Sequence, residues 1–400
     1  VYVEPSYITT ETEWRPIEES LEFISNPEVS SDPTATAFYD ASSKIEGIVS
    51  SAEAISQYDE TIPNVSEPYA GILAEEDEPE SVIGGDGRAK ITTTTSYPWR
   101  TIVKLYITAA DSSTWIGSGA IIDGFHVLTA GHVAHMDTHG GWVSSIRVVP
   151  AMDNLADPYG EAWMTTMRSY TGWTVSQNKG HDWAVLTLDR NIGSYTGWMG
   201  RMTAGSGNSI YTGTINTAGY PSDLDSGVNM YFDAALGDGA TSLKHYYWAD
   251  TFGGQSGMPV WRYVSGSRYI LTVHAYGRAG LDSNYGTRLN SDKYNRINTW
   301  LSDDAGSAPS DKADLEDRGL IYSSYTPGTV TPGTTSFTVN SDVRNRGTAS
   351  SGGFYVYYYA STNTFISPID YFLGSDYVSS ISPFNYRDSS WTGVFPTSVP

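Results

Sequence analysis

Three short segments of the sequence carry side chains that could form a nucleophilic site. His132 lies in LTAGHVAH, Asp182 in HDWAVLTLD and Ser256 in DTFGGQSGMPVW. A serine hydroxyl attacks well only when a histidine takes its proton and a carboxylate holds that histidine in the correct tautomer. The order His, Asp, Ser is one of the chain orders in which this geometry occurs. The sequence therefore predicts acyl transfer by a triad of these three residues.

The glycines before Ser256 supply a second requirement, a cradle for the negative charge that develops during attack. Gly253 and Gly254 have no side chains, so the backbone N–H groups of Gly254 and Ser256 can both turn toward an oxyanion. Any one such residue alone is usually structural, but three motifs in this order favour a catalytic site. We therefore predict an oxyanion hole made by Gly254 and Ser256.

A zinc site is the alternative use of the histidines in the first motif. His132, His135 and His139 could bind a metal, because neutral imidazoles at helical spacing can ligate zinc. No H-E-x-x-H arrangement is present, and Gly140-Gly141 would end a helix at once. We therefore predict no metal site, and the triad chemistry requires no cofactor.

The three motifs resemble those of the chymotrypsin-fold serine peptidases. VIGGDGRAKITTTTSYPWRTIV also resembles the mature start of the glutamyl endopeptidases, the V8-like branch of that family. The resemblance runs from about Ser81 to Trp300 and implies two six-stranded β-barrels with the active site between them. Met258 departs from the family pattern, which usually has a small residue there, and this change affects packing behind the nucleophile.

The same resemblance implies a pocket for an acidic side chain. In glutamyl endopeptidases a histidine on the strand after the nucleophile and a hydroxyl residue five positions before it bind the substrate carboxylate. His274 in LTVHAYG and Thr251 match these positions, and an imidazole N–H and a hydroxyl can both donate to a carboxylate. Two alternatives stay open: His274 is an ordinary strand histidine, or Asp250 makes the pocket prefer Arg or Lys.

From residue 81 onward the pattern is that of an all-β protein, with short apolar or alternating runs between turn residues. Asp123-Gly124 separates the apolar runs 120–122 and 126–128. This pair predicts a hairpin, because both central turn positions accept positive φ. Asp182 stands at the head of another apolar strand, which would bury its carboxylate.

The segment SDKYNRINTWLSD predicts one closing helix after the strands. Ser291 is its expected cap, and Tyr294, Ile297 and Leu301 fall on one face. The chain is therefore expected to contain four parts: an acidic propeptide (1–80), a peptidase domain (81–302), a linker (303–312) and a β-sandwich (313–400).

The first 80 residues carry most of the negative charge. They hold 19 acidic and two basic residues, which accounts for −17 of the net charge of −22. We expect a propeptide with a short amphipathic helix near residues 14–24, or a solvated tail. The composition boundary, the family start and the glutamate coincide at Glu80–Ser81. Self-cleavage there is predicted, with the new amine completing the acidic pocket, because Gln255 cannot form the ion pair of trypsin-like zymogens.

Residues after 313 return to alternating strands. Phe337, Val339, Ser341 and Val343 alternate, as do residues 354–358, which fits a small β-sandwich. NRGTASSGGFYVYYYAS resembles the CARDB family of Ig-like modules of exported prokaryotic proteins. The chain stops before the final strands of such a module, so we expect it to be partial, and a cell-surface or protein partner is implied for it.

Composition narrows the remaining function classes. There is no cysteine, so disulfides and thiolate chemistry are excluded. No apolar run has membrane-spanning length, and no basic region suits nucleic acid. The start at Val1 suggests a missing upstream signal, so the expected location is extracellular or on the cell surface. The prediction is a secreted serine endopeptidase acting on proteins or peptides after glutamate, with aspartate as second candidate. A non-catalytic adhesion protein is the rival reading.

Overall fold

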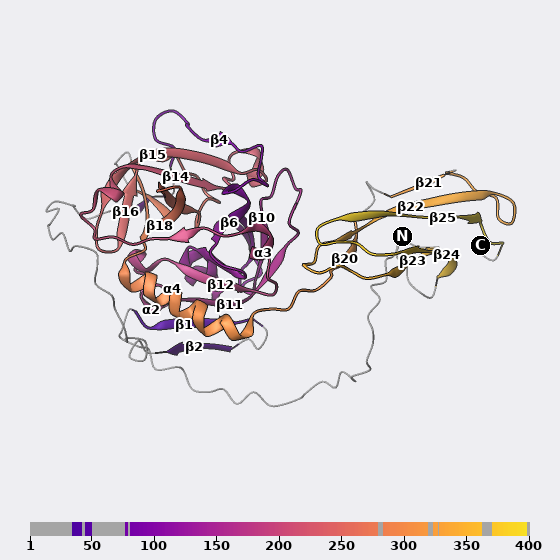
Figure 1. Ribbon diagram of the computed structural model, residues 1–400, viewed down its shortest axis with the longest axis horizontal. Helices are drawn as coiled ribbons and strands as arrows, with labels where there is room; N and C mark the ends of the chain where they lie inside the picture. Colours follow the sequence, from indigo (N-terminus) through magenta and orange to yellow (C-terminus); the bar gives the residue numbers. More distant parts are fainter. Residues whose placement is uncertain are drawn as a thin grey trace. The chain divides into compact units, whose positions relative to one another are not determined.

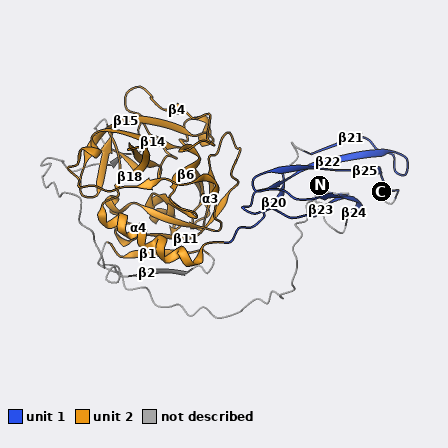
Figure 2. Cartoon of the chain, viewed as in Figure 1, with its two compact units in different colours: residues 1–24, 310–400 blue, residues 25–309 orange. Residues whose placement is uncertain are grey.

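The structure, a computed structural model, describes residues 34–41, 45–49, 77–78, 81–278, 283–318, 323–326, 328–361 and 370–397. For residues 45–49 and 77–78 only the backbone is considered. Residues 25–309 form one compact unit, and the described residues from 310 onward belong to a second (Figure 2). No helix among the described residues has the length and apolar character needed to cross a membrane.

Six antiparallel strands close the first barrel (Figure 1). Their order around the ring is β10, β5, β6, β7, β12 and β11, and β11 returns to β10. The strands are β5 (Ile102–Thr108), β6 (Thr114–Ile121), β7 (His126–Thr129), β10 (Ser145–Pro150), β11 (Ala162–Tyr170) and β12 (Ala184–Leu188).

A second ring of six antiparallel strands follows in the order β18, β17, β14, β15, β16 and β19, and β19 returns to β18. The strands are β14 (Thr214–Gly219), β15 (Tyr231–Ala240), β16 (Lys244–Tyr247), β17 (Pro259–Val264), β18 (Ser267–Arg278) and β19 (Asn284–Arg288). The predicted double barrel is thus confirmed.

Short elements complete this unit. Three strands extend the second barrel: β3 (Asp77–Glu78) and β13 (Gly200–Arg201) on β18, and β4 (Ala89–Lys90) on β15. The others are β8 (His135–Met136), β9 (Gly141–Trp142), α1 (Gly131–Ala134), α2 (Thr171–Thr174), α3 (Gly193–Thr196), η2 (Trp99–Thr101), η3 (Asp137–His139), η4 (Lys179–His181), η5 (Ser209–Tyr211), η6 (Asp225–Gly227) and η7 (Ala305–Ser307).

Part of the predicted propeptide is built into the first barrel. β1 (Thr36–Asp40) pairs antiparallel with β11, and β2 (Ile45–Val49) pairs with β1. Ala35 and Ala37 are buried there. This segment is therefore more ordered than an acidic tail. The amphipathic helix expected near residues 14–24 lies outside the described residues.

The hairpin that contains Asp123 forms as predicted but for a different reason. β6 and β7 pair through Ala120↔Leu128 and Ile121↔Val127. Gly124 has no positive φ. Instead the carboxylate of Asp123 accepts the backbone N–H groups of Phe125 at 2.9 Å and His126 at 2.8 Å, so the aspartate side chain organises the turn.

Helix α4 (Ser291–Asp304) closes the unit. Its cap is Asn290, whose side chain accepts the N–H of Lys293 at 3.0 Å, so the prediction of Ser291 is wrong by one residue. Trp300 stacks on Trp183 with ring centroids 5.0 Å apart. The buried face consists of Lys293, Ile297, Trp300 and Asp304. Of the predicted face only Ile297 is fully buried, whereas Leu301 is partly buried and packs against the core, and Trp300 joins the buried face.

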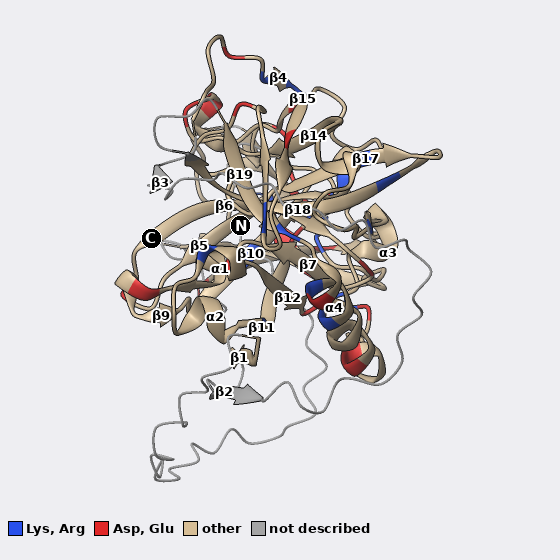
Figure 3. Ribbon diagram, turned by 90° about the vertical axis from the view of Figure 1, so that its left-hand side faces the viewer, with Lys and Arg blue, Asp and Glu red and all other residues tan. Residues whose placement is uncertain are grey.

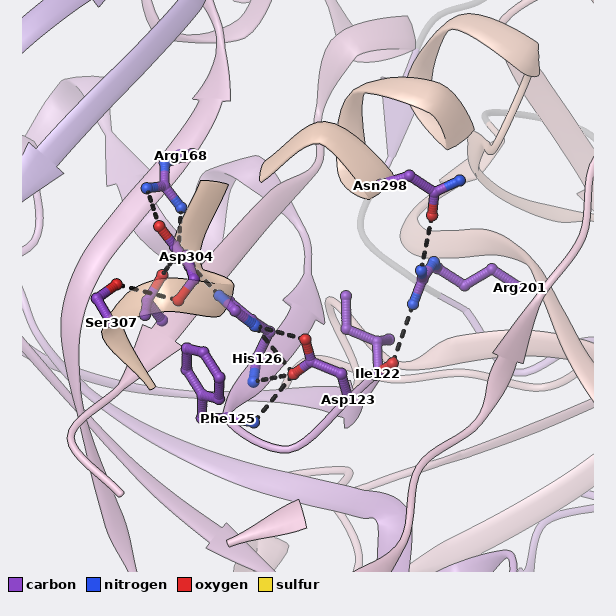
Figure 4. A network of polar contacts seen from close by, with 10 residues as sticks. Ile122, Asp123, Phe125, His126, Arg168, Arg201, Asn298, Asp304 and Ser307 are labelled. Carbon is purple, nitrogen blue, oxygen red and sulfur yellow. Dashed lines mark hydrogen bonds and ion pairs between the residues drawn. The ribbon is translucent and has the colours of Figure 1, made fainter. Parts of the chain in front are cut away.

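Asp304 joins the end of α4 to the first barrel (Figure 4). Arg168 on β11 donates to its two carboxylate oxygens at 2.5 and 2.7 Å, and Nε2 of His126 lies 2.9 Å away. Nδ1 of His126 faces Asp123 at 2.8 Å. Burial by itself lowers the pKa of His126, but the contacts with both carboxylates outweigh it and raise that pKa.

The C-terminal unit contains two sheets that share one apolar cluster. β22 (Ser336–Asn345) pairs with β20 (Leu315–Asp317), β21 (Ser324–Thr326) and β25 (Tyr386–Val394), and β23 (Phe354–Ala360) pairs with β24 (Tyr371–Val378). The cluster is made of Val343, Phe354, Val356, Tyr358, Val378 and Ile381. The Ig-like identity of this unit stays a prediction.

Charged residues of both signs are interspersed in the unit of residues 25–309, for example along α4 (Figure 3).

Asp304 offers a test of how such charges stabilise the fold. Burial raises the pKa of its carboxyl, but the hydrogen bonds from Arg168 and His126 outweigh this and hold the pKa well below its usual range. Its contribution to stability is therefore present above about pH 4 and is lost as the pH falls further.

We expect Asp304→Asn to lower the free energy of unfolding at neutral pH by about 2 to 3 kcal/mol, because Arg168 loses a charged partner. The difference from the native chain should shrink below about pH 4. Urea unfolding followed by tryptophan fluorescence measures both effects. The exposed neighbour Asp303→Asn is the control, and equal stability of the two variants would contradict the assigned role.

Candidate active site

His132 and Asp182 form a close pair in the first barrel. His132 lies in α1, directly after β7, and Asp182 lies between η4 and β12. Nδ1 of His132 is 2.7 Å from one carboxylate oxygen of Asp182, and the backbone N–H of His132 donates to the other at 2.8 Å. The Asp182 side chain is fully buried, whereas 28% of the His132 side chain is exposed. This contact fixes the ring orientation that a proton-transferring histidine needs.

Gly131 allows this approach. A Cβ at this position would stand 2.7 Å from the Trp173 ring and 2.9 Å from the Asp182 carboxylate. A larger residue would therefore displace one of them. The small residue before His132 thus makes room for a carboxylate and an indole ring.

Tyr276 on β18 is a further partner of Asp182 that was not among the predicted residues. Its hydroxyl donates to the same carboxylate oxygen that faces His132, and its ring lies 5.7 Å from the imidazole. Thr287 on β19 donates to the backbone carbonyl of Asp182 at 2.8 Å. The second barrel thus holds an acid that belongs to the first. The register of β18 against β19 shifts between His274 and Tyr276, so simple alternation along the sequence does not signal this contact.

Ser256 lies in a turn that is hydrogen-bonded to strands of both barrels. Its carbonyl accepts the N–H of Ser118 on β6 at 2.9 Å, and the N–H of the next residue, Gly257, donates to the backbone carbonyl of His274 on β18 at 2.8 Å. A Cβ on Gly257 would collide with Thr129 Oγ1 at 2.1 Å. Thr129 is three residues before His132, so the fold brings the serine turn against the histidine segment.

The two glycines orient the peptide groups before Ser256. The carbonyl of Gly253 accepts the N–H of Ser222 at 2.8 Å, and the carbonyl of Gly254 accepts the hydroxyl of Ser118 at 2.8 Å. A trans peptide points its N–H opposite to its carbonyl, so the N–H of Gly254 turns away from Ser222. Gly254 has φ +99°, and a Cβ there would stand 2.6 Å from the Tyr220 carbonyl, so this position requires glycine.

Gln255 holds the same turn from within. Its side-chain Oε1 accepts the N–H of Phe252 at 3.0 Å. Its backbone N–H donates to the Phe252 carbonyl at 3.0 Å, and its carbonyl accepts the N–H of Met258 at 2.9 Å. The last contact directs the N–H of Ser256 to the opposite side. Met258 is fully buried, and its sulfur lies 3.5 Å from Nε2 of Gln255, so this unusual residue does pack behind the serine.

Thr251 and His274 are both completely buried beside this turn. Oγ1 of Thr251 has no hydrogen-bond partner among the residues that the structure describes. Nδ1 of His274 lies 2.5 Å from the Tyr247 hydroxyl. Burial, and to a lesser extent the nearby charge of His132, lower the pKa of His274 to about 3. The imidazole of His274 is therefore neutral at physiological pH.

Asp250 is already occupied by backbone donors. Its two carboxylate oxygens accept the N–H groups of Ile83 and Gly87 at 2.6 Å each. Only 4% of the residue is exposed. The carboxylate thus fastens the segment after Ser81, and its oxygens are not directed to a substrate.

Ser81 lies next to the same pocket residues. Its N–H donates to Oδ1 of Asn284 at 3.1 Å, and its carbonyl accepts Nδ2 of Asn284 at 2.7 Å. The backbone N–H of Thr251 also donates to the Ser81 carbonyl at 3.2 Å. Glu80, the residue on the other side of the predicted cleavage bond, lies outside the described residues.

Two hollows border the site. One of about 500 Å³ is lined by Ile116, Trp115, Ser222, Gly253 and Gly254 among others. The other, of about 280 Å³, lies beside His132 and Trp173. Trp115 lines both hollows. The surface on both sides of the His132 and Ser256 segments is therefore open to an extended ligand.

The three histidines considered as zinc ligands line one hollow, but two of them have carboxylate partners. His132 is bound to Asp182, and Nδ1 of His139 pairs with Asp111 at 2.8 Å. The described residues contain no group of three or more His, Asp or Glu placed to hold a metal ion.

Comparisons with known proteins agree with this geometry. A model of the trypsin family matches residues 89–233, which include His132 and Asp182. The chain is 34% identical over 227 residues to a Bacillus subtilis protein named extracellular metalloprotease, covering 56% of this chain and 71% of that protein. It is 31% identical over 227 residues to the glutamyl endopeptidase of Bacillus licheniformis, covering 55% and 69%.

A solved structure of a Glu endopeptidase in complex with MPD superposes with a TM-score of 0.50 and 25% identity, covering 55% of this chain and 99% of that one. The word metalloprotease in the name of the Bacillus subtilis relative implies a metal that the described side chains do not fit.

Tyr276→Phe tests the support of Asp182. Removal of the hydroxyl leaves a buried carboxylate with one donor fewer, so the free energy of unfolding should fall by about 1 to 3 kcal/mol. Thermal and urea unfolding measure it. Tyr263→Phe, an exposed tyrosine on β17, is the matched control, and an equal effect in both variants would contradict the role of Tyr276.

Proposed function

The chain belongs to the trypsin family of serine peptidases, and from this premise we propose that it is a secreted glutamyl endopeptidase made as a proenzyme. The pair of His132 and Asp182 at 2.7 Å supports the catalytic part of the proposal. The acidic preference is supported by the neutral His274 and by the Thr251 hydroxyl, which has no hydrogen-bond partner within the described part of the chain. The name extracellular given to the Bacillus subtilis relative supports secretion.

In the proposed reaction Oγ of Ser256 attacks the backbone carbonyl carbon of the substrate glutamate, and its proton passes to Nε2 of His132. Asp182 keeps the imidazole oriented. When the tetrahedral intermediate collapses, the C–N bond breaks and His132 returns the proton to the leaving amine. Water then releases the acyl group by the same steps. The N–H groups of Gly254 and Ser256 stabilise the oxyanion at each stage.

The pocket chemistry favours a carboxylate held by hydrogen bonds. Burying a hydroxyl without a hydrogen-bond partner costs desolvation free energy. Thr251 would regain a hydrogen bond by donating to a substrate carboxylate, which offsets this cost. His274 is neutral, so a ring N–H rather than a full charge would meet the second oxygen. A substrate that lacks the carboxylate would leave these groups unsatisfied, which produces discrimination.

The preference for Arg or Lys is less well supported. It required Asp250 to face the substrate, yet both oxygens of Asp250 accept backbone N–H groups. A basic side chain would have to displace these contacts. Family membership likewise weighs against a purely adhesive protein, although the C-terminal unit is still proposed to be an Ig-like module that binds a cell-surface or protein partner.

The proenzyme part of the proposal concerns the bond Glu80–Ser81. Ser81 contacts Asn284 and Thr251, so a new amine at Ser81 would arise beside the proposed pocket. β3 (Asp77–Glu78) pairs antiparallel with β18 at Gly277, three residues from His274. Residues on both sides of the bond therefore lie close to the residues that would bind a glutamate side chain.

We expect the processed chain to cleave peptides after Glu, weakly after Asp and not after Arg, and Ser256→Ala to abolish cleavage. Thr251→Val should lower kcat/KM for the Glu peptide about 10- to 100-fold, since one hydrogen bond to a charged group is lost. Thr203→Val, which also removes a buried hydroxyl without a partner among the described residues, is the control. Cleavage after Arg would refute the pocket assignment and retain the triad.

Processing gives a separate prediction. Glu80→Gln should block appearance of the species that begins at Ser81, because the bond no longer follows an acid. The Ser256→Ala chain should stay uncut until active enzyme is added. Mass spectrometry of the intact chain follows both. A fully active species that still begins at Val1 would contradict the proenzyme proposal.

A further inference from the structure

Arg88 is a buried cation in the segment that follows Ser81. Its side chain has no exposed surface. Asp86 accepts from Nε at 3.0 Å and from Nη2 at 2.9 Å. Asp223 accepts from Nη1 at 3.0 Å and from Nη2 at 2.6 Å. A guanidinium that donates two hydrogen bonds to each of two carboxylates has a fixed orientation.

The same guanidinium reaches the residue before Ser256. Nη1 of Arg88 lies 3.5 Å from Oε1 of Gln255, the outer limit of a hydrogen bond. Gln255 is 1% exposed, so water does not compete for this oxygen. Because Oε1 also accepts the N–H of Phe252, a cation beside it favours the amide orientation that holds the serine turn.

Asp223 gives Arg88 a second connection to that turn. The neighbouring residue, Ser222, donates its N–H to the Gly253 carbonyl at 2.8 Å. This contact turns the N–H of Gly254 to the opposite side. Arg88 thus contacts Gln255, which lies in the serine turn. Through Asp223 it also anchors the backbone that binds the Gly253 carbonyl.

We propose that Arg88 is a positioning residue for the oxyanion hole. Its guanidinium holds Gln255 and the backbone at residues 222–223 so that the N–H groups of Gly254 and Ser256 face the developing oxyanion. The inference rests on the proposed function of Ser256. Trypsin-like zymogens order this loop with the new N-terminal amine, whereas here an internal cation stands at the residue before the nucleophile. Arg88 is present before and after cleavage at Ser81, so this part of the site does not need the amine.

Without the guanidinium, Asp86 and Asp223 lose their shared cation and repel each other, and Gln255 is free to turn its amide. Loss of one oxyanion donor costs about 10²- to 10³-fold in rate. A purely structural ion pair would instead lower stability and leave the rate unchanged. The two roles are therefore separable by comparing rate with stability.

The test is the rate at which a fluorophosphonate labels Ser256 in the full chain, because this reagent needs the oxyanion hole and not the glutamate pocket. Arg88→Met should lower the labelling rate about 10²-fold, and Arg88→Lys should retain an intermediate rate. Adding guanidinium ion to Arg88→Ala, far below denaturing concentrations, should restore labelling. Arg168→Met, which removes an equivalent arginine from the Asp304 network, is the control for stability.

Arg88→Met and Arg168→Met that lose similar stability and both label at the native rate would overturn the inference. So would Arg88→Ala that labels slowly and does not respond to guanidinium ion. A processed chain, beginning at Ser81, that labels at Ser256 and fails to cleave after glutamate would refute the substrate preference alone. Absence of labelling in both the full and the processed chain would overturn both proposals.

Discussion

The carboxylate of Asp182 has no exposed surface, and a buried charge must be compensated by hydrogen bonds. Two donors come from His132, and the third is the hydroxyl of Tyr276 on the other barrel. The full set of donors to this carboxylate is therefore present only where the two barrels meet. The same contacts fix the imidazole, so the requirement that keeps the fold together also prepares the histidine for proton transfer.

The serine turn depends on a second set of long-range contacts. Ser118 on β6 binds the carbonyls of Gly254 and Ser256 through its hydroxyl and its N–H, so the first barrel orients the nucleophile segment of the second. The segment after Ser81 is bound to this turn through two contacts: Asp250 accepts its backbone N–H groups at Ile83 and Gly87, and its Arg88 reaches Gln255. We infer that docking of this segment shapes both the substrate pocket and the proposed oxyanion hole.

The sequence predicted the barrels, the closing helix and the candidate residues His132, Asp182 and Ser256 because short local motifs carry them. It did not predict Tyr276 or Arg88, since their partners are 94 and 167 residues away and no local pattern records such pairings. The inward position of Trp300 on α4 was missed for the same reason, because its stacking partner Trp183 is a distant residue. Asp250 was considered a possible pocket acid because the residues around it in the sequence do not reveal its true partners. These are backbone N–H groups of the distant segment after Ser81.

The most direct test of the account is covalent capture with diphenyl phosphonate peptides that carry Glu or Lys at the reacting position, followed by peptide mapping by mass spectrometry. The account predicts a stoichiometric adduct on Ser256 with the Glu reagent and a far slower reaction with the Lys reagent. Capture at another residue would contradict the nucleophile, and equal capture of the two reagents would contradict the pocket formed by Thr251 and His274.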